Sequence, residues 1–257
     1  MNWKIVHIDE TDSTNSWLRK RLAADKYGLA RTKNCADENS QCQSVQSDAY
    51  MVVWAEYQTA GRGCGTNRWE SERGMNLTFS MLIHPKELPA TQQFHISMAI
   101  SLAICEAIGQ YIGDVSIKWP NDIYWRNGKI GGILIENTLK GSSIMESIIG
   151  VGLNVNQRLF KSNAPNPVSM WQICEHETDR EALLKEILEA FERILGSMIR
   201  EQYLLKLYRR QGYHPYADKE GVFMAEIVTV EDDGHLVLRD DNGKERRYAF
   251  KEVQFII

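Results

Sequence analysis

A buried strand that runs directly into a glycine-rich loop is the feature that most limits what this chain can fold into. Residues 50–56 read YMVVWAE, and their β-branched and aromatic content predicts a strand inside a sheet. The loop that follows, residues 58–69, reads QTAGRGCGTNRW. Its glycines allow the backbone to approach a bound group closely, and Arg62 offers a planar fork of donors that suits carboxylate or phosphate. The sequence therefore predicts a sheet with an anion-binding loop at one strand end.

The rest of the first 212 residues predicts a mixed sheet with helices. Asp12 or Ser13 caps a first helix, and the Asn127-Gly128 dipeptide marks a hairpin turn. A capping box at 178–181 starts a long helix with an apolar stripe that runs to Met198, and Gly212 to Pro215 break it. We expect an α+β domain whose sheet is covered on one face. Further strands are expected at 3–8, 76–83, 115–118, 123–125, 129–137 and 144–154, and a further helix at 92–111.

The composition changes after residue 212. Short alternating runs at 222–230, 236–239 and 247–250 are separated by glycine turns, which is typical of β-hairpins. We therefore divide the chain into a first domain, 1–212, and a small β-barrel domain, 213–257.

The bulk properties of the 257 residues exclude several classes of protein. Hydrophobic content of 43%, charged content of 25% and a net charge of -4 describe a globular protein without a global attraction to nucleic acid or an anionic membrane. The N-terminus has no secretory signal pattern and no window is apolar enough to span a bilayer, so we expect a cytoplasmic protein. The polar segment 31–48 reads as a loop to which we assign no chemistry.

Cysteine and histidine spacing offers no fixed metal site. The five cysteines, an odd number without a C-x-x-C pair, fit free thiols in a reducing compartment. The six histidines are scattered without ligand spacing. The cysteines are at 35, 42, 64, 105 and 174, and the histidines at 7, 84, 95, 176, 214 and 235.

Six short motifs occur in an order that resembles the biotin protein ligases, the biotin-[acetyl-CoA-carboxylase] ligases. The resemblance extends over more than half the chain. Its motifs are Ser-Thr-Asn at 13–15, A-E-x-Q-T-A-G-R-G at 55–63, N-L-x-x-S at 76–80, K-W-P-N-D at 118–122, G-K-I-x-G-I-L-x-E at 128–136 and G-x-G-x-N-x-N at 150–156.

The resemblance implies a catalytic domain of the biotin/lipoate ligase type followed by an SH3-like C-terminal domain. It implies that ATP, with Mg²⁺, activates biotin to biotinyl-5′-AMP and pyrophosphate. Biotin is then transferred to a lysine of the biotin carboxyl carrier domain of a biotin-dependent carboxylase. The sequence does not identify the carboxylase or distinguish a monomer from a dimer.

Adenylating a carboxylic acid brings two anions together, which favours positioned cations over an acid/base pair. Arg62 and Lys118 are the expected catalytic residues, Arg62 as a bidentate clamp and Lys118 as a point charge between the attacking oxygen and the α-phosphate. A solvated lysine at a strand end is the alternative for Lys118. Asp122 either caps a turn or contacts Mg²⁺ through the triphosphate, and we favour the turn.

The remaining site residues follow from the resemblance and from the chemistry of biotin, which has a neutral ureido ring at one end. Uncharged amide and hydroxyl groups suit that ring, although 13–15 also reads as a plain helix cap. Trp54, Trp119 and Trp125 are candidate walls, with core packing as the alternative. The expected biotin-binding residues are Ser13, Thr14, Asn15, Gln58, Gly61, Arg62, Gly63, Cys64, Lys118, Gly131 and Gly132, and the ATP-binding residues are Arg62, Lys118, Asn121, Lys129 and Asn154.

The chain departs from the family pattern at Cys64, Gly65 and Asn67, where the fuller loop often carries arginines. We hypothesise that this protein holds biotinyl-5′-AMP less tightly or uses other donors. Cys64 either has a lowered pKa beside Arg62 or is an ordinary unreactive side chain.

Three other functions compete with the ligase interpretation. A bifunctional ligase and repressor needs a DNA-binding module before the Ser-Thr-Asn motif, and the chain is expected to be a short form without one. A lipoate ligase would carry an Arg-Arg-x-Ser-Gly-Gly-Gly pattern, which is absent. A non-catalytic biotin-binding protein would not need both Arg62 and Lys118.

Overall fold

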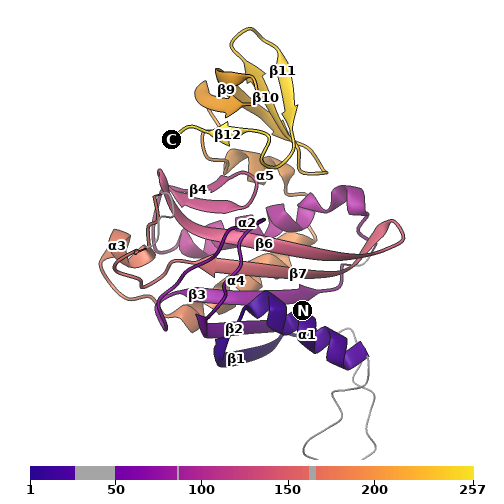
Figure 1. The fold of residues 1–257 in the computed structure, drawn as a ribbon, viewed down its shortest axis with the longest axis vertical. Helices are drawn as coiled ribbons and strands as arrows, with labels where there is room; N and C mark the ends of the chain where they lie inside the picture. The colour runs from indigo at the N-terminus through magenta and orange to yellow at the C-terminus, as the bar shows by residue number, and fades with distance from the viewer. Residues whose placement is uncertain (27–49, 86, 162–165) are drawn as a thin grey trace, which may run out of the picture.

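The computed structural model describes residues 1–26, 50–85, 87–161 and 166–257, and they form two sheets with helices around the larger one (Figure 1). The α+β fold with a smaller C-terminal β unit is thereby confirmed. In chain order the elements are β1 (Lys4–Thr11), α1 (Thr14–Lys26), β2 (Met51–Gln58), β3 (Leu77–Ile83), the 3-10 helix η2 (Ala90–Gln92), α2 (Phe94–Ile108), β4 (Val115–Lys118), β5 (Asp122–Trp125), β6 (Gly128–Lys140), β7 (Ser143–Leu153), α3 (Met170–Cys174), α4 (Arg180–Leu195), α5 (Arg200–Leu205), β8 (His214–Asp218), β9 (Gly221–Val230), β10 (Leu236–Asp240), β11 (Glu245–Tyr248) and β12 (Gln254–Phe255).

The larger sheet has seven strands in the order β1-β2-β3-β7-β6-β5-β4. β1 pairs with β2 in parallel, and the other neighbours are antiparallel, so the sheet is mixed as predicted. Its β4 edge is covered because Ile117 exchanges backbone hydrogen bonds of 2.8 Å with Lys206 and Tyr208. This arrangement places the end of β2 and the β4–β5 connection on either side of the central strands.

Helices lie on both faces of this sheet, which corrects the prediction of one covered face. On one face, α2 and α4 pack with alternate residues of the strands, such as Phe79 and Met81, in the main core. α1 lies on the other face (Figure 1). Its Leu18 packs with Val53 and Leu82 in a second, smaller core. α1 therefore leaves only part of that face open.

The prediction of one long helix after residue 179 was wrong. α4 ends at Leu195, Gly196 follows, and α5 begins at Arg200. Met198, assigned to the apolar stripe, is 99% exposed. The N-cap is the side chain of Asp179, which accepts from the backbone N–H groups of Glu181 and Ala182. Apolar residues continue at helical spacing beyond Leu195, so the spacing alone does not reveal that the helix ends at Gly196.

Two further strands and one short helix were not predicted. α3 begins with a capping box of Ser169 and Gln172, and β8 and β12 add to the C-terminal sheet. The predicted loop at 31–48, with Cys35 and Cys42, lies outside the described residues, whereas Cys64, Cys105 and Cys174 are free thiols. Among the described residues, no helix is long and apolar enough to cross a membrane.

The five C-terminal strands form an antiparallel sheet in the order β11-β10-β9-β8-β12. Figure 1 shows this sheet in orange to yellow, beyond β4 and α5 of the larger unit. The turn at Gly234 joins the two units, since Trp119 Nε1 donates to the Gly234 carbonyl at 2.9 Å. Gly234 has φ of +94°, and a methyl group there would lie 2.7 Å from the Phe94 ring. The C-terminal sheet is thus seated directly on the K-W-P-N-D segment.

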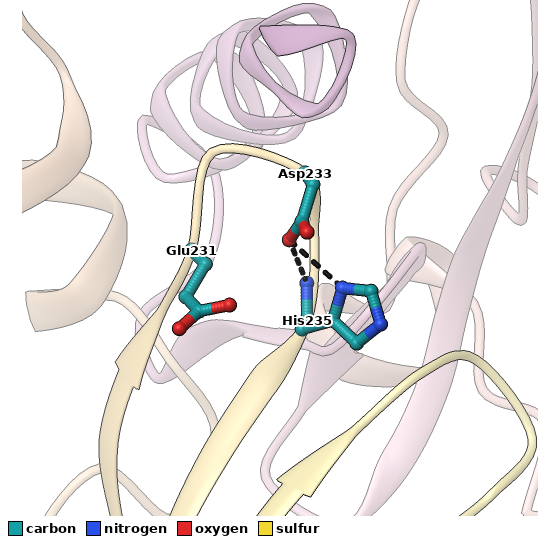
Figure 2. Close-up of side chains that lie close together, drawn as sticks. All are labelled: Glu231, Asp233 and His235. Atoms are coloured by element: carbon teal, nitrogen blue, oxygen red, sulfur yellow. Dashed lines mark hydrogen bonds and ion pairs between the residues drawn. The ribbon is translucent and has the colours of Figure 1, made fainter. Parts of the chain in front are cut away.

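The same turn gathers Glu231, Asp233 and His235, which sequence spacing did not single out (Figure 2). Arg247 already pairs with both carboxylates, at 2.5 Å from Glu231 Oε2 and 2.5 Å from Asp233 Oδ2. His235 Nδ1 lies 2.8 Å from Asp233 Oδ1. The cluster is therefore a set of paired charges that fixes the turn.

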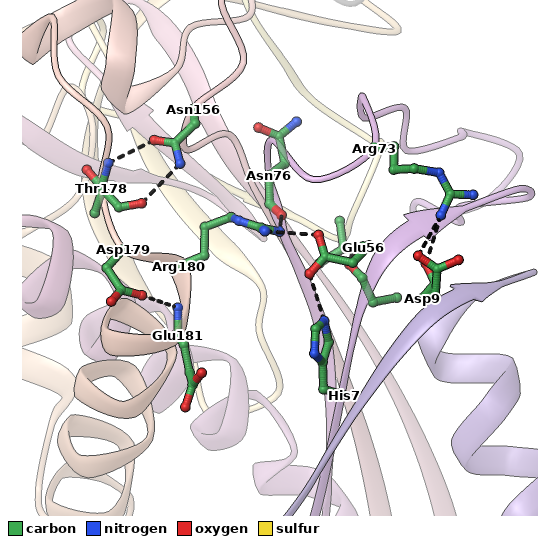
Figure 3. A network of polar contacts seen from close by, with 12 residues as sticks. His7, Asp9, Glu56, Arg73, Asn76, Asn156, Thr178, Asp179, Arg180 and Glu181 are labelled. Atoms are coloured by element: carbon green, nitrogen blue, oxygen red, sulfur yellow. Dashed lines mark hydrogen bonds and ion pairs between the residues drawn. The ribbon is translucent and has the colours of Figure 1, made fainter.

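Arg180, the first residue of α4, ties that helix to the sheet (Figure 3). Its guanidinium donates to Glu56 Oε2 at 2.9 Å and to the Asn76 carbonyl at 3.2 Å, and it lies 5.4 Å from the centre of the Trp54 ring. His7 Nε2 lies 2.7 Å from the other oxygen of Glu56. One half-buried arginine therefore holds three segments together.

Arg180→Ala is expected to lower the free energy of unfolding by about 1–3 kcal/mol, because it removes hydrogen bonds to a charged, largely buried partner. Urea unfolding measures this change. Lys185→Ala on the same helix removes an exposed ion pair with Glu181 and is the matched control, with little change expected. Equal unfolding midpoints for the two variants would contradict the assigned role of Arg180.

Candidate active site

A cavity of about 480 Å³ opens on the sheet beside the start of α1. Its size is within the range usual for sites of small ligands. Six parts of the chain line it. They are the start of α1 (Ser13, Thr14, Asn15), the loop after β2 (Gln58, Arg62, Gly63, Cys64, Asn67, Arg68, Trp69), residues 118–122, strands β6 and β7 (Lys129, Gly132, Ile133, Leu134, Gly150, Val151, Gly152) and the C-terminal segment (Phe250, Lys251, Val253, Gln254, Phe255).

Glycines on β6 and β7 make room for the side chains that stand on the sheet. A methyl group on Gly150 would lie 2.2 Å from Asn15 Oδ1, and one on Gly152 would lie 2.3 Å from Cε2 of the Trp69 indole. Such distances are impossible for real side chains. The Trp69 ring therefore rests directly on the backbone of Gly152, and only glycine permits this contact.

One end of the cavity is polar and uncharged. Gln58 Oε1 accepts from the Thr14 backbone N–H at 2.8 Å and from its hydroxyl at 3.2 Å. Ser80 Oγ lies 2.7 Å from Thr14 Oγ1 and 2.5 Å from Asn15 Oδ1, and Ser80 is fully buried. These bonds fix the orientation of Thr14, Asn15 and Gln58. The predicted polar group is thus brought together, with Ser80 of the N-L-x-x-S motif behind it.

The loop after β2 is a narrow hairpin. Gly63 N donates to the Asn67 carbonyl at 2.9 Å, and Trp69 N donates to the Gly61 carbonyl at 3.0 Å. Gly65, at the turn, has φ of +68°, which favours glycine. The backbone pairing fixes where Arg62 and Trp69 leave the loop.

Arg62 is engaged by a carboxylate in this structure. Its two terminal nitrogens lie 2.9 Å and 3.4 Å from the oxygens of Glu136, which also accepts from Asn15 Nδ2 at 2.9 Å. Burial favours a higher pKa for Glu136, but hydrogen bonds from Asn15 and Arg62 and the charge of Arg19 outweigh it and lower its pKa. Glu136 therefore holds Arg62 as an anionic partner at the edge of the cavity.

Lys118 is half-buried at the end of β4. Its Nζ lies 5.2 Å from the centre of the Tyr124 ring and 5.1 Å from that of Phe255. Within the described ranges no ion pair of Lys118 is found. Burial lowers the pKa of Lys118, and the charges of Lys129 and Arg209 lower it further, against an opposing effect of Asp122. This partly buried environment differs from that of an ordinary solvated lysine.

Asn121, Asp122 and Lys129 form the wall next to Lys118. Asn121 Nδ2 donates to the Ile133 carbonyl at 2.8 Å, and Ile133 N donates to the Asn121 carbonyl at 2.9 Å. Asp122 Oδ1 lies 2.7 Å from Lys129 Nζ. Asp122 is the one carboxylate on the cavity wall within the described part of the chain.

Cys64 lies against this wall as a thiol with a raised pKa. Burial is the main cause of the rise, and the charge of Asp122 adds to it. Asn121 Nδ2 lies 3.2 Å from the sulfur. The structure thus favours the unreactive alternative for this side chain.

Gly61, Gly131 and Asn154 are predicted site residues that do not line the cavity. Gly61 supports the loop, since a methyl group there would lie 2.3 Å from the Trp69 carbonyl. Gly131 packs behind the cavity wall, and a methyl group on it would lie 3.1 Å from the Gly152 carbonyl. The Asn154 amide donates to the Val168 carbonyl at 3.1 Å and the residue is buried.

The aromatic walls also differ from those expected. Trp119 lines the cavity, whereas Trp54 and Trp125 lie outside its lining. The Trp54 ring stacks on His7 with 3.9 Å between the ring centres, and the Arg126 guanidinium lies 4.6 Å from the centre of the Trp125 ring. Trp69 was missed, although it ends the glycine loop. The C-terminal segment was missed too, and no motif there could have indicated it.

Comparison with known proteins agrees with the fold and the motifs. The model of the biotin/lipoate A/B protein ligase family matches residues 30–154. The chain is 29% identical over 240 residues to the biotin--[acetyl-CoA-carboxylase] ligase of Paracoccus denitrificans, covering 84% of this chain and 95% of that protein. It is 31% identical over 213 residues to the bifunctional ligase/repressor BirA of Escherichia coli, covering 81% of this chain and 55% of that protein.

The fold matches that of a solved ligase. The biotin protein ligase from Aquifex aeolicus, in complex with biotin and ATP, aligns with a TM-score of 0.73 and 22% identity over 98% of this chain and 99% of that chain. The sequence motifs, the sheet topology and the matching family model agree with one another. The chain therefore resembles the biotin/lipoate A/B protein ligase family in the sequence of residues 30–154 and in its fold.

Proposed function

We propose that the chain is a biotin protein ligase that adenylates biotin with ATP and transfers the biotinyl group to a lysine of a carrier domain. One observation carries the proposal: a single cavity has an uncharged polar end at Thr14, Asn15 and Gln58 and a cationic end at Lys118 and Lys129. Biotin has the same division, with a neutral ureido ring and a carboxylate. Complexes of related ligases with biotin and ATP support the same assignment.

In the first step an oxygen of the biotin carboxylate attacks the α-phosphorus of ATP, and the bond from that phosphorus to the pyrophosphate oxygen breaks. Lys118 is the proposed point charge between the two anions, and Arg62 is the proposed clamp after it exchanges Glu136 for the ligand. In the second step the acceptor amine attacks the acyl carbon and AMP leaves. No acid/base pair is required for the first step.

The remaining assignments follow from the same division of the cavity. Gln58 and residues 13–15 are proposed to bind the ureido ring, and Asn121 and Lys129 the nucleotide. Trp69 is added as an apolar wall. Gly61, Gly131 and Asn154 are proposed to support the site from behind.

Mg²⁺ is proposed to enter with ATP. It usually keeps several waters and takes one or two carboxylates together with substrate phosphates. Asp122 suits that role as the single carboxylate available on the described cavity wall, once ATP competes for Lys129. The ion would neutralise phosphate charge.

We also propose the division into a catalytic domain, 1–212, and a C-terminal domain, 213–257. Cytoplasmic location is proposed because the reaction consumes ATP.

Transfer to a biotin carboxyl carrier domain tests the whole reaction. Mass spectrometry of the carrier is expected to find one added biotinyl group that depends on ATP and on the acceptor lysine. A carrier whose lysine is replaced by arginine is the control. Biotin binding without any transfer would contradict the proposal and favour a binding protein.

The pH dependence of ATP binding tests the state of Lys118. A lysine binds anions in its charged form, and burial lowers the pKa of Lys118 below 10.5. As pH rises through that lowered pKa the charge is lost, so ATP affinity should fall at a pH where an exposed lysine is still protonated. Lys118→Arg keeps its charge and should lack this fall. Titration calorimetry between about pH 7 and pH 10 measures the ATP affinity of both proteins. The prediction is contradicted if the affinity of wild type and that of Lys118→Arg change with pH in the same way.

A further inference from the structure

The cations around the cavity differ in whether a carboxylate already holds them. Arg62 pairs with Glu136, and Lys129 pairs with Asp122. Arg68, Lys118 and Lys251 line the same cavity, and no ion pair of these three is found within the described ranges. Lys251 therefore brings a charge to the cavity that an anionic ligand meets without displacing a carboxylate.

Lys251 reaches the glycine loop from the other sheet. It follows β11 in the segment that lines the cavity, and a methyl group on Gly65 would lie 2.5 Å from its Nζ. The loop provides no cation of its own at Cys64, Gly65 or Asn67. The ammonium thus stands over the turn of the loop, at the place where the loop lacks charge.

The backbone of Lys251 has a conformation that favours glycine, and among the described non-glycine residues with positive φ it is the one that lines the cavity. Its φ is +70°, a left-handed conformation that costs a residue with a Cβ roughly 1–2 kcal/mol and costs glycine nothing. The turn is held by Glu252 N, which donates to the Ala249 carbonyl at 3.1 Å. Strained residues of this kind cluster at ligand sites. A lysine at position 251 is therefore less favourable for the backbone than a glycine would be.

We propose that Lys251 is a phosphate-binding residue of the active site. Its ammonium contacts the phosphate of ATP and of the acyl-adenylate formed from it. Lys251 supplies the positive charge that residues 64–67 lack, and the C-terminal sheet is therefore part of the site. This inference rests on the proposed function. Of the two alternatives drawn from the sequence, it favours the use of another donor: biotinyl-5′-AMP is retained by a residue of the C-terminal sheet.

The test is the dissociation rate of purified biotinyl-5′-AMP from the whole chain, measured for wild type, Lys251→Gly, Lys251→Glu and Lys251→Arg. A charge-assisted hydrogen bond is worth roughly a 10- to 100-fold change, so Lys251→Gly should release the adenylate at least about ten times faster. Lys251→Glu should be faster still, and Lys251→Arg close to wild type.

Lys251→Gly should also unfold at a temperature no lower than wild type, since it relieves the backbone. Arg126→Gly is the matched control: Arg126 is another cation with positive φ, +49°, and it lies outside the cavity lining. Unchanged release from Lys251→Gly, with wild type binding the adenylate, would overturn the inference alone. A wild type that does not bind biotinyl-5′-AMP would instead overturn the proposed function.

Discussion

Lys118→Ala is expected to lower the rate of biotin adenylation by a factor of about 10² or more, the usual cost of removing a group that stabilises developing charge. The ammonium is held between two aromatic rings and has no carboxylate partner in the described part of the chain, so its charge is available to the ligand. Single-turnover release of pyrophosphate measures the rate.

Two variants make this result specific. Lys140→Ala changes an exposed lysine at the far end of β6 and should leave the rate unchanged. Lys118→Arg keeps the charge but not its compact shape, so it should recover only part of the rate. If Lys118→Ala adenylates biotin as fast as Lys140→Ala does, the assigned role of Lys118 is wrong.

Gly152→Ala is expected to weaken binding of both biotin and ATP by at least about tenfold. The added methyl group would lie 2.3 Å from the Trp69 indole, which is rigid and must move into the cavity. Overpacking of this kind costs typically 1–3 kcal/mol, and here the displaced ring would occupy the space of the ligand. Titration calorimetry with each ligand measures the loss, and tryptophan fluorescence reports the displacement.

Gly113→Ala is the control, because a methyl group at Gly113 would meet nothing within 4 Å. Its ligand affinities should equal those of wild type. Wild-type affinities in Gly152→Ala would show that Trp69 is not a wall of the ligand site.

Most of the sheet was predictable because its signals are local. The run YMVVWAE became β2, and the hairpin signal at Asn127 became the β5–β6 connection. Residues 58–69 and 118–122 were singled out by motif, and the fold brings both to one cavity. Such features depend on a few neighbouring residues, which a sequence displays directly.

The features that were missed depend on contacts between distant residues. Nothing local to Lys251 indicates that it stands over Gly65, since that placement requires Gly234 to seat the C-terminal sheet on Trp119. Trp69 is the last residue of the predicted loop, but its position on Gly152 follows from the sheet register. The end of α4 was misplaced because the apolar period continued past Gly196.

Biotin-dependent exchange of labelled pyrophosphate into ATP tests the central claim most directly, because it detects reversible adenylation without a carrier protein. The wild type is predicted to exchange label when biotin is present and not when it is omitted, and Arg62→Ala should reduce the exchange by about 10². A wild type that binds biotin and ATP but exchanges no label would contradict the account, because the cavity would then bind both ligands without joining them.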